Sequence, residues 1–138
     1  MEKSRFQFTN PILKRLEFTL HDDFSKRGRT EMGINLSANF QRTQNEDQTL
    51  ANTALVSVTI SVGAKDNSTP FYIEAEEEAN FKWEENIFTE EQIDALLNHN
   101  AVALLISYLR PIIANITAAS PYPTYNLPYI DLTSKSEF

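Results

Sequence analysis

A long apolar stretch over residues 89–119 constrains this chain more than any other feature of its sequence. The stretch opens with the signals of a helix N-terminus. Thr89 at the N-cap can accept a hydrogen bond from the backbone N–H of Gln92, while the Gln92 side chain reaches back to the N-cap. Phe88 and Ile93 flank this pair as a hydrophobic staple. The sequence therefore predicts a helix that begins directly after Thr89.

Apolar residues cover almost the whole circumference of this helix. One set follows the helical period, as in an ordinary covering helix: Ile93, Leu96, Leu97, Ala101, Leu104, Tyr108 and Ile112. A second set fills much of the remaining surface: Val102, Leu105, Ile106, Leu109, Ile113 and Ile116. A helix that is apolar all round must be buried all round, and a chain of 138 residues has little else to bury it with. We therefore predict that the second set forms an interface with another copy of the chain.

Two places in the stretch are expected to disturb the helix. Residues 98–100, Asn-His-Asn, predict a break between a short helix and a long one. Pro111 removes a backbone hydrogen bond, so a kink is expected near Ser107 to Pro111. The stretch is long enough to cross a membrane. However, Arg110 and Asn115 lie in its middle and no basic cluster flanks it, so we expect no membrane insertion.

Composition excludes several classes of function. The net charge of −7 opposes binding to nucleic acid. The absence of cysteine excludes disulfides and thiol catalysis. His21 and His99 are isolated in the sequence, which argues against a metal site. Asp22 and Asp23 have no third catalytic group near them, which argues against acid/base catalysis. The three glycines form no phosphate-binding loop. We expect neither an enzyme nor a cofactor or metal. The N-terminus lacks the apolar run of a secretory signal, which predicts a cytoplasmic location.

The chain before the helix alternates between apolar and polar residues, as half-buried strands do. Four strands are predicted, at residues 12–20, 32–41, 54–62 and 71–83. In the first, the even positions from Ile12 to Leu20 are expected to share the buried face. In the last, Glu77 interrupts the apolar face and suggests a bulge. Short connections between strands followed by helix predict a single α+β domain over residues 1–138, an antiparallel sheet with helix on one face and flexible ends at 1–5 and 133–138. The free edges of such a sheet, like the surplus apolar helix, favour an oligomer.

The C-terminal part of the chain carries two short motifs at a defined spacing. Tyr108-x-Arg110 on the helix is followed by Asn126-Leu127-Pro128 within YPTYNLPYIDL. These motifs, and their spacing without a gap, resemble the SecB family of protein-export chaperones. Phe6-Gln7-Phe8 and the strand after it resemble the family's first strand, so that the agreement covers residues 6–132. Ser107, Pro111 and Ser120-Pro121 depart from the family pattern, which suggests a divergent member.

The resemblance implies a four-stranded antiparallel sheet followed by a short and a long C-terminal helix. It also implies assembly as a dimer of dimers, or as a dimer, with long helices between sheets. The implied function is ATP-independent holding of unfolded polypeptides, with delivery to the SecA translocation motor in the export branch. Two alternatives stay open. One is a subunit dedicated to a single folded partner, as in chaperones that guard toxin–antitoxin systems, and the other is a small-ligand carrier or enzyme with a pocket between sheet and helix.

If the protein holds unfolded polypeptides, several aromatic and apolar side chains are candidates for a groove that binds client peptides: Phe24, Trp83, Phe88, Tyr122, Tyr125, Leu127 and Tyr129. Prolines stiffen the tyrosine-rich tail, so that little ordering entropy is lost on binding. The alternative is that these rings only cap the core. Glu74, Glu76 and Glu78 form an acidic stripe on the outer sheet face, a candidate docking site for a SecA-type partner. An ordinary solvated strand face is the alternative there.

Overall fold

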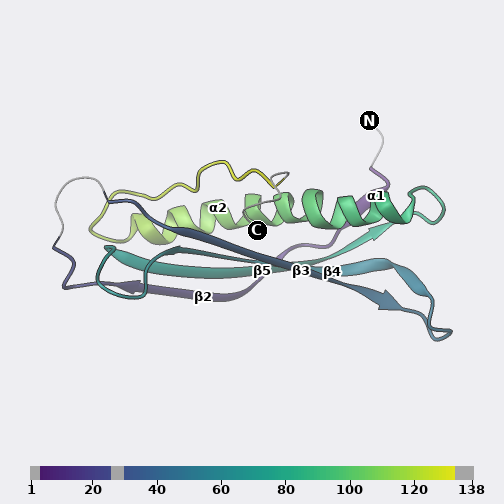
Figure 1. The fold of residues 1–138 in the computed structure, drawn as a ribbon, viewed down its shortest axis with the longest axis horizontal. Helices are drawn as coiled ribbons and strands as arrows, with labels where there is room; N and C mark the ends of the chain where they lie inside the picture. The colour runs from purple at the N-terminus through teal and green to yellow at the C-terminus, as the bar shows by residue number, and fades with distance from the viewer. Residues whose placement is uncertain (1–3, 26–29, 133–138) are drawn as a thin grey trace.

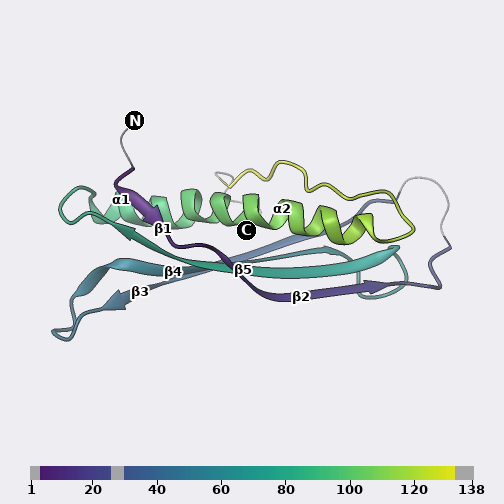
Figure 2. The ribbon, with the colours of Figure 1, turned by 180° about the vertical axis from the view of Figure 1, so that it is seen from behind.

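The computed structural model describes residues 4–25 and 30–132, and shows an antiparallel sheet covered on one face by a single helical rod (Figures 1 and 2). The elements, in chain order, are β1 (Phe6–Phe8), β2 (Ile12–Leu20), β3 (Ile34–Gln44), β4 (Leu50–Gly63), β5 (Phe71–Trp83), α1 (Glu90–Ala95), the π-helical turn η1 (Leu96–Asn100) and α2 (Ala101–Ala118). The predicted α+β class is confirmed.

The sheet has five strands, one more than predicted. β3, β4 and β5 follow one another as antiparallel neighbours, and β1 and β2 both pair with the far edge of β5. β1 lies opposite residues 81–83 of β5, and β2 lies opposite residues 71–78. The extra strand arises because residues 9–11, Thr-Asn-Pro, interrupt the edge. Pro11 has no N–H to donate to a ladder.

The core lies between the helical rod and the two central strands. β4 contributes Ala54, Val56, Val58, Ile60 and Val62, and β5 contributes Phe71, Ile73, Ala75, Ala79, Phe81 and Trp83. The helices contribute Ile93, Leu97, Ala101, Val102, Leu105, Ile106, Leu109 and Ile113. Successive strand residues point to opposite faces, so these strands present polar residues on the side away from the helix. We call the two sides of the sheet the helix-facing side and the outer side.

A bulge in β2 overturns the predicted phase of that strand. Leu13 pairs with Glu77 and Arg15 with Glu76, so Lys14 is the extra residue. The helix-facing residues of β2 are Leu13, Leu16, Phe18 and Leu20, because they pair with helix-facing residues of β5, whereas Ile12 lies on the outer side opposite Glu78. The prediction that Ile12 and Lys14 share the buried face was wrong. The bulge suggested in the strand of Glu77 is not there, since β5 pairs with β4 without a shift; the bulge lies opposite Glu77, in the neighbouring strand β2.

The helix begins as predicted, but the predicted break is absent. Thr89 accepts from the N–H of Gln92 at 3.1 Å, and the Gln92 side chain accepts from the N–H of Thr89 at 2.9 Å, which completes the capping box. Residues 98–100 do not break the rod, because the chain passes through them as the π-helical turn. α2 also continues past Pro111 to Ala118 without interruption, and both views show one rod rather than two.

By length and composition alone, the rod from Glu90 to Ala118 could cross a membrane. The core helix of a soluble protein meets the same criterion, and here one side of the rod is packed against β4 and β5. The predicted flexible ends fall largely outside the described residues. Of the part that is described, Arg5 forms an exposed ion pair with Glu84 at 3.3 Å.

Candidate functional site

A group of aromatic rings gathers where α2 ends and the C-terminal segment begins. Phe24 and Tyr122 meet edge to face at 6.2 Å between ring centroids, and Phe71 and Tyr125 do so at 6.4 Å. Phe18 lies 5.6 Å from Phe71. We call these five residues the aromatic cluster. All except Phe71 are only half-buried, so part of the surface of each of the others is exposed.

The C-terminal segment, residues 119–132, is held back along the helix by polar contacts (Figures 1 and 2). The hydroxyl of Thr117, which is fully buried, accepts from the backbone N–H of Tyr125 at 2.9 Å. Arg110 donates to the carbonyl oxygens of Leu127 and Pro128 at 2.5 and 3.0 Å. The segment has no regular secondary structure, so these bonds fix where its tyrosines lie.

The seven predicted groove residues do not form one site. Phe24 and Tyr122 contact each other, and Tyr125, three residues further along the C-terminal segment, contacts Phe71. Leu127 is buried in the core, and Tyr129 is 85% exposed. Trp83 and Phe88 lie at the other end of the sheet, beside the connection from β5 to α1, where they line a separate cavity.

Two members of the cluster were not among the predicted site residues: Phe18 and Phe71, which strand alternation assigned only to the sheet. They belong to neighbouring strands, with Phe18 opposite Ile73 and Leu20 opposite Phe71. The alternation of each strand already placed Phe18, Leu20 and Phe71 on apolar faces. What it lacked was the pairing of β2 with β5, which brings those faces together.

The same edge of the sheet carries a row of exposed apolar residues, which we call the apolar row: Phe8, Leu13, Leu16 and Leu20. They lie on the helix-facing side of β1 and β2 and are each 38–40% exposed. At one end Phe8 contacts Tyr108 of α2 at 6.3 Å, and at the other Leu20 pairs with Phe71 of the aromatic cluster. A free sheet edge with exposed apolar side chains is a surface that soluble proteins usually cover.

The acidic stripe on the outer side is partly neutralised by β2. Glu74 forms an ion pair with Arg15 and accepts from the hydroxyl of Tyr72 at 2.7 Å. Glu78 lies 3.5 Å from the ammonium of Lys14. Glu76 pairs in register with Arg15 on the neighbouring strand. The stripe is therefore less negative than its sequence alone indicates.

The residues predicted to form an interface on the helix face the protomer's own sheet. Val102, Leu105, Ile106, Leu109 and Ile113 are all buried in the core, and Ile116 is half-buried against it. Because these five residues have almost no exposed surface left, they cannot bury more against a second copy. The helix surface that stays available includes Leu104, Tyr108 and Ile112, which are half-buried or exposed. The interface itself stays a prediction.

One carboxyl group lies in an unusual place. Glu77 is 3% exposed and belongs to the helix-facing side of β5, between Leu13 of β2 and Val58 of β4. Its Oε2 has no hydrogen-bond partner among the described residues. Burial raises the pKa of this carboxyl, because the low-polarity surroundings disfavour its charged form. Burial likewise raises the pKa of the Tyr125 phenol in the aromatic cluster.

The chain is similar to known proteins in both sequence and fold. An uncharacterized protein of Methanocaldococcus jannaschii is 28% identical over 135 residues, which cover 94% of this chain and 81% of the relative. Among solved structures, the Mycobacterium tuberculosis Rv1957 SecB-like chaperone in complex with a ChAD peptide from the Rv1956 HigA1 antitoxin matches with a TM-score of 0.65, 16% identity and 91% coverage of both chains.

A protein of unknown function from Streptococcus agalactiae matches with a TM-score of 0.53 and 12% identity, over 90% of this chain and 97% of that one. At such identities these structures show a shared fold. The family model described as preprotein translocase subunit SecB matches residues 16–134, which is most of the sequence. The chain belongs to the SecB family.

Proposed function

We propose that this protein is an ATP-independent holdase chaperone, which binds unfolded polypeptides at the aromatic cluster. The observation that carries the proposal is a set of half-buried rings on a segment fixed by Arg110 and Thr117. Holding an unfolded chain makes and breaks no covalent bonds, so the proposal needs neither catalytic residues nor a cofactor.

The physical properties of the cluster suit many different clients. Aromatic rings bury large apolar areas, and a tyrosine hydroxyl can stay in water while its ring is covered. Because the backbone around Tyr122 and Tyr125 is already ordered by hydrogen bonds, little conformational entropy is lost when a client binds. Several weak contacts of this kind, on more than one copy, would hold a long client by avidity.

The apolar row is proposed as the interface between copies. Its residues Phe8, Leu13, Leu16 and Leu20 lie along a free sheet edge, where a second copy can cover them and pair with the strand. Leu104, Tyr108 and Ile112 on the outward side of α2 would extend the same interface. A homo-oligomer, either a dimer or a dimer of dimers, would also bring several aromatic clusters onto one particle.

Membership of the SecB family supports the proposal that this chaperone is cytoplasmic and serves protein export. The acidic stripe is the proposed docking face for a SecA-type motor. Because Arg15 and Lys14 already pair with Glu74 and Glu78, docking there would need a partner whose cations compete with those of β2. No membrane insertion is proposed, since one side of the helical rod is packed on the sheet and Arg110 binds the C-terminal segment.

A second candidate function is a chaperone dedicated to one partner, for example the antitoxin of a toxin–antitoxin system. The solved SecB-like chaperone from Mycobacterium tuberculosis contains a peptide from an antitoxin, and this likeness favours the candidate. Such a protein would bind its partner in a saturable one-to-one complex and would ignore unrelated denatured proteins.

An aggregation assay tests the proposal. The purified protein, without ATP, is mixed with an unrelated chemically denatured enzyme, and light scattering is followed on dilution. We expect the protein to suppress aggregation, and we expect Phe24→Ala with Tyr122→Ala to lose most of this effect. Tyr129→Ala is the matched control, because it removes a tyrosine that lies outside the cluster and is 85% exposed. A wild-type protein that leaves aggregation unchanged would contradict the holdase function and favour the dedicated chaperone.

A further inference from the structure

We propose that His21 is a positioning residue of the aromatic cluster. Its side chain ties the turn that carries Phe24 to the β4–β5 connection, residues 64–70, and so fixes the place of the Phe24 ring. The inference rests on the proposed function, because it treats the cluster as the site that a client meets. It gives a role to a buried histidine that stands isolated in the sequence.

His21 binds the β4–β5 connection through both its backbone and its ring. It follows the last residue of β2 and is 7% exposed. Its backbone N–H donates to the carbonyl oxygen of Pro70 at 3.0 Å, one step beyond the β2–β5 pair of Leu20 and Phe71. Its ring Nδ1 lies 2.9 Å from the carbonyl oxygen of Thr69. One residue thus binds two successive carbonyl groups of the connection.

The bond to Thr69 determines which ring nitrogen of His21 carries a hydrogen. A carbonyl oxygen can only accept, so Nδ1 is the donor. Nδ1 keeps its hydrogen in this neutral tautomer and in the charged imidazolium alike. The bond therefore exists in both protonation states, and it acts as a permanent structural tie.

The β4–β5 connection is itself held firmly where His21 binds it. The hydroxyl of Thr69 accepts from the N–H of Ala64 at 2.9 Å and donates to the carbonyl oxygen of Phe71 at 2.9 Å, and Thr69 is 6% exposed. Gly63, just before the connection, has a φ of 89°, and a side chain there would collide with the carbonyl oxygen of Phe71. Because the connection closes on Phe71, a residue bonded to Thr69 is held at a set place relative to that ring.

The other end of the tie is the ring of Phe24. The N–H of Phe24 donates to the carbonyl oxygen of His21 at 3.0 Å, which closes a four-residue turn. Asp22 and Asp23, the two central residues of this turn, are exposed and offer no apolar surface to hold it. The turn places Phe24 edge to face with Tyr122, at 6.2 Å between ring centroids. His21 is therefore the buried residue that anchors the turn.

Through His21 the two ring contacts of the aromatic cluster are connected. Phe24 meets Tyr122, and Phe71 meets Tyr125. Tyr122 and Tyr125 lie on the same C-terminal segment. On the side of the sheet, Phe24 is joined to Phe71 through His21 and the β4–β5 connection. A client that covers both contacts binds more tightly when their separation is already fixed, since less conformational entropy is then lost.

Three replacements of His21 separate the hydrogen bond from the bulk of the ring. In His21→Asn the amide nitrogen can take the position of Nδ1 and should keep the bond to Thr69. In His21→Gln the amide nitrogen lies one bond further out, near the position of Nε2. His21→Leu has the branched shape of asparagine without a donor, and because leucine suits a buried site, it tests the tie even if the glutamine variant does not fold.

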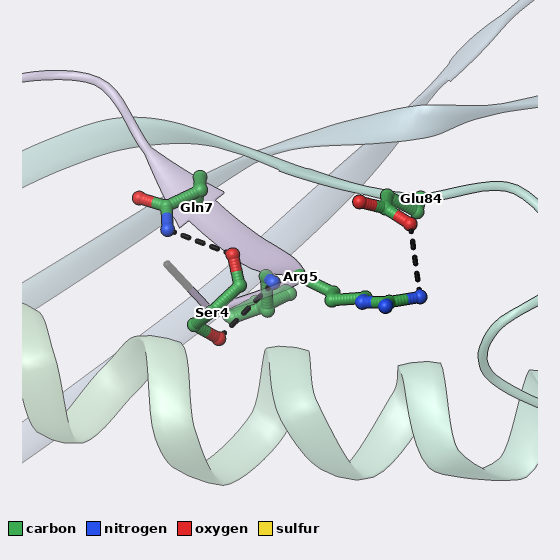
Figure 3. A network of polar contacts seen from close by, with 5 residues as sticks. Ser4, Arg5, Gln7 and Glu84 are labelled. Atoms are coloured by element: carbon green, nitrogen blue, oxygen red, sulfur yellow. Dashed lines mark hydrogen bonds and ion pairs between the residues drawn. The ribbon is translucent and has the colours of Figure 1, made fainter. Parts of the chain in front are cut away.

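Arg5→Gln is the control for these variants. Arg5 forms an ion pair with Glu84 at 3.3 Å, which also joins two segments that are far apart in the sequence (Figure 3). Both side chains are largely exposed, and they lie where β1 meets the end of β5, away from the aromatic cluster. Losing this tie should therefore affect neither the cluster nor the client.

Nuclear magnetic resonance measures the position of Phe24 without any client. The five tyrosines of the full-length protein are labelled with carbon-13, and the Tyr122 signal is assigned with Tyr122→Phe. The ring current of Phe24 shifts this signal, and Phe24→Leu gives its value without the contact. We expect His21→Gln and His21→Leu to move the signal towards that value, and His21→Asn and Arg5→Gln to leave it near that of the wild type. An unmoved signal in His21→Leu, or equal movement in His21→Asn, would overturn the proposal.

Client affinity is measured with a labelled unfolded chain, reduced and alkylated α-lactalbumin, at a temperature at which the variants are folded. We expect His21→Gln and His21→Leu to weaken binding about tenfold, and His21→Asn and Arg5→Gln to stay within about twofold of the wild type. Unchanged affinity in His21→Leu would overturn the proposal, because the tie would then not serve the client site. If the wild type does not bind this chain while the Tyr122 signal responds as expected, the holdase function fails, whereas the tie between His21 and Phe24 is supported.

Discussion

Arg110 of α2 donates hydrogen bonds to the carbonyl oxygens of Leu127 and Pro128, and so binds the C-terminal segment to the helix that precedes it. Leu127, whose carbonyl accepts one of these bonds, is itself buried in the core. The side chain anchors the segment by apolar contact, and the guanidinium anchors its backbone. Together these contacts place Tyr122 and Tyr125 at the end of the sheet.

Replacing Arg110 should loosen this segment. Arg110→Ala removes two hydrogen bonds from a charged donor, and we expect the free energy of unfolding to fall by about 1–3 kcal/mol. Arg110→Lys should recover only part of the loss, because an ammonium cannot reproduce the planar fork that reaches both carbonyls. Urea unfolding measures the change. Limited chymotrypsin digestion should cut Arg110→Ala faster after Tyr122 and Tyr125, and an unchanged digestion rate would show that the bonds do not hold the segment.

Removing the hydroxyl group of Thr117 should destabilise the protein even when the shape of the side chain is kept. The hydroxyl donates to the carbonyl oxygen of Ile113 at 2.9 Å and accepts from the N–H of Tyr125 at 2.9 Å, in a fully buried position. In Thr117→Val the N–H of Tyr125 loses its acceptor, so we expect a loss of about 1–2 kcal/mol in unfolding free energy. Thr117→Ser keeps the hydroxyl and serves as the control. If valine and serine have equal effects, packing rather than the hydrogen bond explains the position.

Local sequence signals predicted the parts of the fold that depend on neighbouring residues. The capping box at Thr89 and Gln92 was identified, since both partners lie within one helical turn. Alternation identified the extents of β2 to β5 with errors only at the ends of β3 and β4. It ended β3 too early and began β4 too late, because polar residues such as Gln44 and Asn52 extend those strands beyond the apolar run.

The predictions that failed depended on contacts between distant residues. The side of β2 that faces the helix is decided at Lys14, where the bulge exists only in relation to Glu77 and Glu76 of β5. The side of α2 that meets the sheet could not be chosen from periodicity, because both apolar sets follow it equally well. The spacing between Arg110 and Leu127 could be recognised in the sequence. The hydrogen bond between them could not be predicted, because it forms only when the C-terminal segment folds back along α2.

The buried carboxyl of Glu77 should lower the free energy of unfolding at neutral pH, because its pKa is raised in the folded state. A carboxyl whose pKa is higher in the folded state than in the unfolded state costs stability when it is ionised, and the cost disappears as pH falls below the unfolded value, about 4.3. We expect Glu77→Gln to raise the unfolding free energy by roughly 1 kcal/mol at pH 7. The gain should shrink as the pH falls towards about 4.3.

Glu76→Gln provides the comparison for Glu77, since it makes the same change on the outer side of the same strand. We expect it to change the unfolding free energy by no more than about 0.5 kcal/mol. Thermal unfolding of both variants across this pH range measures the difference. A gain at Glu77 that does not depend on pH would mean that its charge is not the source of the cost.

The apolar row makes a prediction about assembly. Leu16 is 38% exposed on the helix-facing side of β2, and a charge there would be buried without a partner if a second copy covers the row. Leu16→Glu should therefore shift the protein towards the monomer mass of 15.8 kDa in size-exclusion chromatography with light scattering. Thr19→Glu adds the same charge to the outer side of the same strand and should leave the mass unchanged. A wild-type protein that is monomeric at every concentration would show that the apolar row is not an interface between copies. Client binding would then be the function to test there, because the row adjoins the aromatic cluster at Leu20 and Phe71.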